Sequence, residues 1–282
     1  MSKGRAFLLL LVGWAMTPPR ASAMHGRPRA LLRLAVVPLT IVFCTVTANA
    51  QGVVLPLPPA DQQEIAAKLG PSVVGAARPS EAILDASAYF PLQPKTLPFQ
   101  VTAGKYAGNI QELGLKSALR PGGSPAWRFR LSPSLAGFIT VAPSGDLIMP
   151  AISDFDEGVV VVSTPATPFV TKGMKPGDSV KLSQAVSVNY LDNPSKQDHS
   201  GNLTTTQTYV GMYQVTVPAG TFDAVLLRLH YDGKIGPASV KYRSWYFFAR
   251  NVGVIAMITH EEVSAAWIYH TDATTGKVLA GR

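Results

Sequence analysis

The sequence predicts a mainly β protein, in which an antiparallel meander forms a curved sheet or an unclosed barrel and one short helix lies near the N-terminus. Two observations predict this class. From about residue 101, short β-rich stretches alternate with turn signals, and no long stretch has helical periodicity. The turns are rich in Pro, Gly and Asp, as at residues 218–221, and such turns join neighbouring strands into hairpins.

The first fifty residues are predicted to be a targeting segment. Residues 24–50 have a basic start, an apolar centre and a small-residue ending, which is the pattern of a secretory signal cleaved after Ala50. A second signal-like piece precedes it, and we interpret that piece as sequence upstream of a true start at Met16 or Met24. The alternative is an uncleaved anchor, but the apolar centre at residues 34–47 is shorter than the roughly 20 residues that span a bilayer.

Charge and cysteine usage narrow the class of the mature domain. Six of the 25 basic residues and none of the 17 acidic residues lie in the first fifty, so the mature chain has 19 basic residues against 17 acidic ones. We therefore expect no nucleic-acid partner, although the whole chain has a formal charge of +8. Cys44, the single cysteine, lies in the targeting segment, so the mature domain has no thiol for a disulfide, a zinc site or a nucleophile.

The mature chain is predicted to begin with a tether and continue as one β domain. Residues 51–100 are proline-rich and contain a short helix at 61–69, which has an acidic first turn and a Gly-Pro stop. The β domain spans residues 101–282. Its candidate strands are 125–131, 136–142, 145–150, 157–163, 179–190, 204–217, 222–232, 239–249, 252–260 and 263–271.

Two consecutive candidate strands carry apolar side chains on both faces. In 239–249, Trp245 and Phe247 alternate with Tyr246 and Phe248, and residues 252–258 are apolar throughout. An aromatic side chain left in water would forgo roughly 1.5–3 kcal/mol of burial. We therefore expect a second layer over this sheet, formed by the short helix, the proline-rich segment, a second sheet or a ligand held in a lumen.

A hairpin and two later strands resemble a known group of proteins. The motif Val-Pro-Ala-Gly-Thr-Phe at residues 217–222, followed by Trp-Tyr-Phe-Phe-Ala at 245–249, resembles uncharacterised proteobacterial periplasmic β-rich proteins, which are loosely similar to Lol-type lipoprotein carriers. The resemblance covers about residues 204–260. It implies a cup-like β-sheet that binds a lipid or lipoprotein-like ligand, and it transfers no catalytic residue.

Residues that bear chemistry form no recognisable catalytic or metal motif. The common hydrolase motifs and phosphate-binding loops are missing from the sequence. The run His-Glu-Glu at 260–262, with His270, could be considered as a zinc site. Neighbouring residues of a strand point to opposite faces, however, so a solvated strand end is the better explanation. The acidic run 154–158 lacks oxygen ligands after its glycine and fits a charged turn better than a calcium loop. We predict no cofactor, no metal and no catalytic residue.

The candidate ligand contacts come from an aromatic–x–aromatic spacing that recurs on three strands. Sheet core is the commoner explanation of such pairs, and a pocket for an acyl chain or a glycan is the functional one. Arg228 and His230 lie on one face of their strand, where they could contact an anionic head group. The predicted ligand-binding residues are Arg228, His230, Trp245, Phe247, Met257 and Trp267.

Three functional hypotheses follow from these observations. The leading one is a non-enzymatic periplasmic or secreted protein that binds a hydrophobic or amphipathic ligand of the cell envelope, such as a lipid or a lipoprotein, with peripheral membrane contact. The second is a structural or interaction module of the envelope without a small-molecule ligand. The third is a secreted enzyme of unrecognised type. The sequence does not fix the oligomeric state.

Overall fold

The computed structural model describes residues 52–265 and 269–281. The predicted signal segment at 1–50 and the predicted contact Trp267 lie outside the described residues. Residues 52–282 form one compact unit. Within the described ranges, no helix combines the length and the apolar character needed to span a bilayer.

Twelve consecutive strands, β2 to β13, form a closed antiparallel meander barrel. Each strand pairs with the next one along the chain, and β13 pairs with β2, where Val278 lies opposite Gln100 and Leu279 opposite Phe99. The predicted mainly β meander with a short N-terminal helix is confirmed. The sheet is closed rather than merely curved because this last pairing joins its two edges.

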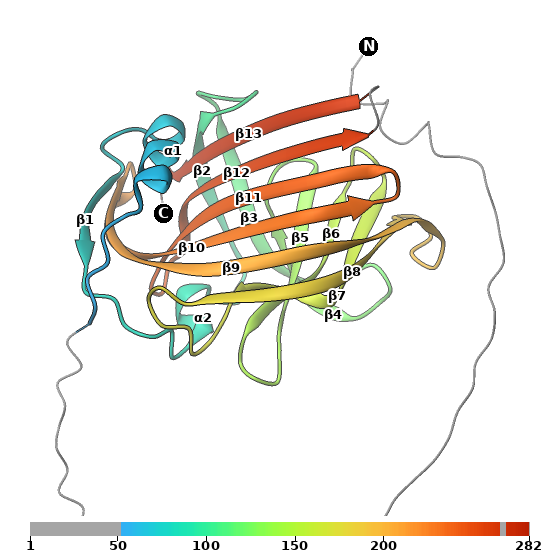
Figure 1. The fold of residues 1–282 in the computed structure, drawn as a ribbon, viewed down its shortest axis with the longest axis horizontal. Helices are drawn as coiled ribbons and strands as arrows, with labels where there is room; N and C mark the ends of the chain where they lie inside the picture. The colour runs from blue at the N-terminus through green and yellow to red at the C-terminus, as the bar shows by residue number, and fades with distance from the viewer. Residues whose placement is uncertain (1–51, 266–268, 282) are drawn as a thin grey trace, which may run out of the picture. The chain divides into compact units, whose positions relative to one another are not determined.

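The barrel strands are β2 (Lys95–Ala103), β3 (Ile110–Leu119), β4 (Pro125–Arg130), β5 (Leu135–Val141), β6 (Leu147–Asp154), β7 (Val159–Val170), β8 (Ser179–Tyr190), β9 (Gln197–Val217), β10 (Gly220–Ile235), β11 (Ala238–Ala249), β12 (Gly253–Ala265) and β13 (Tyr269–Leu279). Figure 1 shows β9 to β13 side by side across the view, with β2 to β6 behind them at a steep angle. This crossed arrangement is the usual geometry of an orthogonally packed barrel.

Two strand predictions need correction. The single strand predicted at 263–271 is wrong, because β12 continues to Ala265 and β13 begins at Tyr269. The sequence analysis also missed β2, which begins within the predicted tether, and β3, which lies in the predicted β domain. Pro94 and Pro98 argue against a strand here, yet β2 pairs with β3 from Lys95 to Gln100, on both sides of Pro98.

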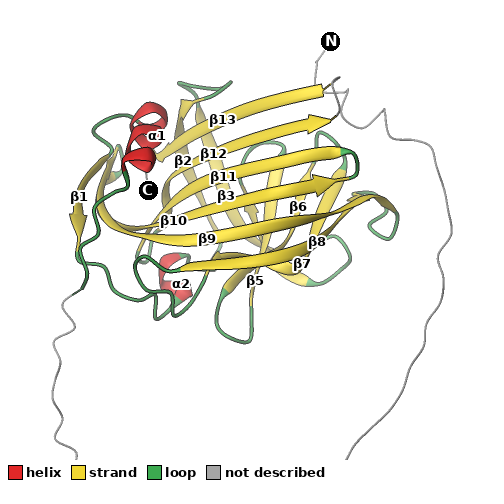
Figure 2. Cartoon of the chain, viewed as in Figure 1, coloured by secondary structure: helices red, strands yellow, loops and turns green. Residues whose placement is uncertain are grey.

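The predicted helix is present as α1 (Pro59–Leu69), drawn in red beside the barrel in Figure 2. A proline opens the helix, where its missing N–H costs nothing, and Gly70 follows it with a positive φ of 116°. A second, one-turn helix, α2 (Ala86–Tyr89), is capped by the Asp85 side chain, which accepts a hydrogen bond from the Ser87 N–H. Both helices lie in the part of the chain predicted to be a tether.

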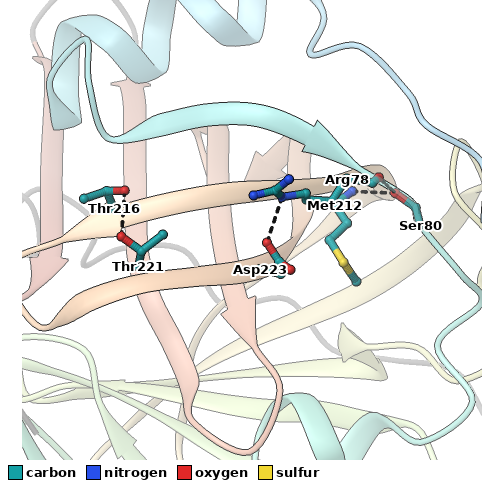
Figure 3. A network of polar contacts seen from close by, with 6 residues as sticks. All are labelled: Arg78, Ser80, Met212, Thr216, Thr221 and Asp223. Carbon is teal, nitrogen blue, oxygen red and sulfur yellow. Dashed lines mark hydrogen bonds and ion pairs between the residues drawn. The ribbon is translucent and has the colours of Figure 1, made fainter.

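A short strand, β1 (Val74–Arg78), adds to β9 outside the closed barrel. Figure 3 shows the polar contacts that hold it there. The Ser80 hydroxyl accepts a hydrogen bond of 2.8 Å from the Met212 N–H, and Arg78 forms an ion pair of 3.0 Å with Asp223 on β10. On the neighbouring hairpin, the hydroxyls of Thr216 and Thr221 lie 3.1 Å apart. These contacts fix the chain that leads from α1 to α2.

Both faces of β11 are covered, as the two-faced pattern predicts. Phe247 and Phe248 point to opposite sides of the barrel wall, and each is 0% exposed. Phe248 faces inward and meets Phe90 and Phe169. The outer face lies beneath α1, whose Ile65 and Leu69 belong to the same apolar core. The second layer is therefore the protein's own helix outside and its own aromatic core inside.

Candidate functional site

The part of the barrel interior around Phe90 is tightly packed. Phe90, which follows α2, meets the rings of Phe129, Phe169 and Phe248 edge to face, at centroid distances of 5.2, 5.0 and 6.3 Å. The cavity beside these rings has a volume of about 10 Å³. Such a volume is close to the minimum for a single water molecule, so this cavity is too small for an organic ligand.

The other half of the interior carries a polar group of side chains, here called the lumenal cluster: Tyr231, Tyr242, Tyr246, Glu261 and Asp154. Strand register places Tyr231 opposite Tyr242 and Tyr242 opposite Glu261, so the three side chains share one face of the sheet. The rings of Tyr231 and Tyr242 stack with centroids 4.9 Å apart and planes 12° apart. The face is the inner one, because Tyr246, two residues from Tyr242, meets Phe169 at 5.8 Å.

The side chains of this cluster combine exposure to water with raised pKa values. The Glu261 side chain is exposed and those of Tyr231 and Tyr242 are half-buried. Desolvation nevertheless raises the pKa of the Glu261 carboxyl, and Asp154 raises it further by like-charge repulsion. Burial also raises the pKa values of all three tyrosine hydroxyls, and Tyr242 and Tyr246 hydrogen-bond to each other. The cluster thus lies on the inner face of the wall, where water reaches part of it.

One buried hydroxyl near the cluster lacks a partner. Ser244 is 0% exposed, and its Oγ makes no hydrogen bond. Ser244 lies between Tyr242 and Tyr246 on the same inner face of β11, and it is paired with Thr259 of β12. Glu261 is therefore its diagonal neighbour across the strands, at about 7–8 Å between Cα atoms. A buried hydroxyl without a partner is costly and calls for an explanation.

The outer wall opposite this region is held by one buried carboxylate. Asp61 of α1 accepts two hydrogen bonds of 2.8 Å from the Arg228 guanidinium and one of 2.8 Å from the Trp245 indole N–H. Asp61 is 2% exposed. A buried carboxylate with three charge-assisted bonds fixes the helix in one position. The contact is structural, because every polar partner of the carboxylate comes from the wall itself.

The five predicted ligand contacts within the described residues lie on both faces of the barrel wall. Four of them lie on the outer face: Arg228 and Trp245 bind Asp61, Phe247 is buried, and His230 is exposed. Met257 lies on the inner face, opposite Tyr246 and Lys277. Strand alternation alone cannot say which face of a closed barrel is inside, and this is why the predicted set mixes both.

The structure also describes the His-Glu-Glu run at 260–262 and the acidic run at 154–158. His260 lies in mid-strand on the outer face, not at a strand end, between Arg243 at 3.2 Å and Asp272 at 2.9 Å. The acidic run forms a charged turn, in which the Asp154 carboxylate accepts hydrogen bonds from the N–H groups of Asp156 and Glu157. Across the described residues, no three His, Cys, Asp or Glu side chains form a potential metal site.

The site thus belongs to a closed antiparallel barrel with a packed aromatic half and a polar lumenal half. No protein-family model matches the chain, and no curated protein sequence matches it. Among solved structures, the crystal structure of a "putative lipoprotein" from Parabacteroides distasonis is similar to this chain at 12% sequence identity and a TM-score of 0.31. The similarity covers 72% of this chain and 99% of that one. A similarity of this size carries no argument about a ligand.

Proposed function

We propose that the protein binds, without catalysis, a hydrophobic or amphipathic ligand of the cell envelope in the lumen beside the lumenal cluster. One observation carries the proposal: Glu261, Tyr231 and Tyr242 are reached by water and yet desolvated, inside a closed barrel. Ligand sites are typically concave and mostly apolar, with a few polar groups that fix orientation. Stacked tyrosine rings supply apolar area, and their hydroxyls supply the polar contacts.

The packed half supports this role as a rigid floor for the lumen. Its interlocking phenylalanines leave no space of their own, and they hold the inner surface on which the tyrosines stand. Pre-organised walls lower the entropic cost of binding. The predicted signal segment adds the location, because a cleaved secretory signal would deliver the domain to the periplasm.

A fluorescence titration with the neutral apolar dye N-phenyl-naphthylamine tests the proposal. The wild-type protein should bind the dye with saturation, and Tyr242→Ala should weaken binding by about tenfold because a half-buried aromatic contact is removed. The matched control is His230→Ala on the outer face, which should bind like the wild type. A dye that fails to bind, or a loss of affinity equal in both variants, contradicts the proposal.

Native mass spectrometry provides the companion test with material from cells. Protein purified without detergent from the periplasm should carry an extra mass in the range of a lipid, and delipidation should remove that mass. A single peak at the mass of the mature polypeptide before and after delipidation contradicts the proposal.

The packed half favours a second candidate, an interaction module of the envelope that needs no small ligand. The observation is the 10 Å³ cavity, since a barrel that fills this much of its own interior is stable without a guest. Crosslinking in cells discriminates the two. A specific protein adduct together with an absence of dye binding would favour the module.

A further inference from the structure

The depth to which water reaches into the barrel can be followed along three neighbouring strands, β11, β12 and β13 (Figure 1). Strand register arranges their inner-face side chains in three rows: an outermost row of Tyr242, Glu261 and Ala273, a middle row of Ser244, Thr259 and Thr275, and a deepest row of Tyr246, Met257 and Lys277. On β13, Ala273 is exposed, Thr275 is half-buried and Lys277 is 3% exposed. The same gradient runs along β12, from exposed Glu261 to buried Met257. The deepest row therefore lies at the bottom of the lumen, next to the packed half.

The deepest row contains one cation, the Lys277 ammonium group. Its Nζ donates a hydrogen bond to the Leu131 carbonyl, which uses one of its three N–H donors. Among the described residues, no carboxylate forms an ion pair with it. Burial lowers its pKa to about 8, so the group keeps its charge in most molecules at pH 7. A buried charge without a counter-ion is costly, and a bound anion would remove that cost.

The middle row places hydroxyl groups beside this ammonium group. Ser244 is 0% exposed, and its Oγ makes no hydrogen bond. Thr275 precedes Lys277 by two residues on the same face of β13, which puts their Cα atoms about 7 Å apart. Hydroxyl and ammonium groups both donate hydrogen bonds, and a carboxylate only accepts them. Bonds of this kind to a charged acceptor are among the strongest in proteins.

The other charged groups of the inner face lie away from this place. Glu261 belongs to the outermost row, and its register partner Ala273 is four residues from Lys277, about 13 Å along the strand. The Asp154 carboxylate accepts hydrogen bonds from two N–H groups of its own turn. Lys95 lies in the packed half, bonded to the Val252 carbonyl beside the cavity of about 10 Å³. Lys277 is therefore the inner-face lysine that a ligand of the lumen can meet.

We infer that the bottom of the lumen binds the carboxylate group of a long-chain monocarboxylic acid, with the Lys277 ammonium group and the hydroxyls of the middle row as its donors. This inference rests on the proposed function and names its ligand class. The acid enters with its carboxylate first, and its alkyl chain lies against the stacked rings of Tyr231 and Tyr242. A single ammonium group matches a singly charged carboxylate better than a doubly charged phosphate.

Competition among three ligands with the same alkyl chain tests the inference. Dodecanoate, dodecanol and dodecylamine are each used to displace N-phenyl-naphthylamine at pH 7, below their micelle concentrations. Dodecanoate should bind at least about tenfold more tightly than dodecanol, and dodecylamine should bind most weakly, because a buried ammonium group attracts one ion and repels the other. Equal or tighter binding of dodecanol overturns the inference.

A pair of lysine variants locates the effect. Lys277→Met keeps the unbranched apolar stem and removes the charge, so it should weaken dodecanoate binding about tenfold and leave dodecanol binding within about twofold. The matched control is Lys95→Met, which removes the inward-facing ammonium group of the packed half and should change neither affinity. Equal losses of dodecanoate affinity in the two variants overturn the inference.

A measurement on the wild-type protein does not depend on how either variant folds. Dodecanoate labelled isotopically at its carboxyl carbon is titrated with acid in the complex and followed by NMR. A carboxylate held by an ammonium group and hydroxyl donors should have a pKa below that of the free acid. A pKa at or above that of the free acid places the carboxylate elsewhere and overturns the inference.

The outcomes also separate the inference from the function on which it rests. If the dye does not bind, both fail. If the dye and dodecanol bind but dodecanoate gains no advantage, the lumen is a binding site without a carboxylate anchor, and only the inference fails.

Discussion

The two halves of the barrel interior differ in packing and polarity. Around Phe90, rings meet edge to face and leave a cavity of about 10 Å³. Around Tyr242, its ring stacks on that of Tyr231, on the inner face that also carries Glu261, Asp154 and a buried hydroxyl without a partner. The first half is optimised for packing, whereas the second keeps polar groups that a stability-driven core would exclude. The packed half thus accounts for stability, and the proposed binding belongs to the polar half.

The comparison predicts that stability depends mainly on the packed half. Phe90→Ala should lower the free energy of unfolding by about 3–5 kcal/mol, because the ring is fully buried among three others and its loss leaves a cavity. Urea unfolding followed by tryptophan fluorescence measures the loss. A change below about 1 kcal/mol would mean that the phenylalanine cluster does not hold the barrel together.

The inner face of the barrel also carries a buried lysine. Lys277 is 3% exposed on the inner face, and burial lowers its pKa to about 8 from the ordinary 10.5. Between these values the unfolded chain binds the proton more tightly, so stability should rise with pH. From pH 8 to 9.5 the wild type should gain about 1–2 kcal/mol relative to Lys277→Met, which cannot titrate. Parallel stability curves for the two proteins would contradict this assignment.

Substitutions in the outer wall should change folding stability without changing ligand affinity. Asp61→Ala leaves Arg228 and the Trp245 indole without their carboxylate, and it should cost about 2 kcal/mol of folding stability. Asp61→Asn keeps an acceptor for the indole and should cost less. Dye affinity should be unchanged in both variants. A large loss of affinity would instead place the ligand under α1.

The smallest effect on stability is expected in the lumenal half. Tyr231→Ala should lower the free energy of unfolding by about 1 kcal/mol, because the ring is half-buried and stacks mainly on Tyr242. Chemical denaturation of Tyr231→Ala and Phe90→Ala under the same conditions compares the losses in the free energy of unfolding from the two halves. Equal losses would mean that the lumenal half is ordinary core.

The sequence predicts much of the fold through turn chemistry and strand alternation. The motif at residues 217–222 marks the β9–β10 hairpin, and the two-faced pattern around Trp245 and Phe248 predicts the double covering of β11. The pairing of β13 with β2 could not be predicted in this way. It depends on contacts between residues such as Leu279 and Phe99, which are far apart in the chain.

The candidate site was less accessible to sequence reasoning. Glu261 reads as part of a solvated His-Glu-Glu run until register places it beside Tyr242 on the inner face. Trp245 and Phe247 read as pocket walls, but the structure places both on the outer face, where the Trp245 indole bonds to Asp61 of α1. The missing information was which face closes inward, and that follows only from the curvature of the whole sheet.

A crystal structure of the protein with bound dodecanol tests the central claim most directly, since this neutral ligand does not depend on the charge of the lumen. The alkyl chain should lie inside the barrel against Tyr231 and Tyr242, with the packed half around Phe90 unchanged. Electron density for the ligand on the outer wall, or among displaced phenylalanines of the packed half, would contradict the division of the interior into a floor and a binding lumen.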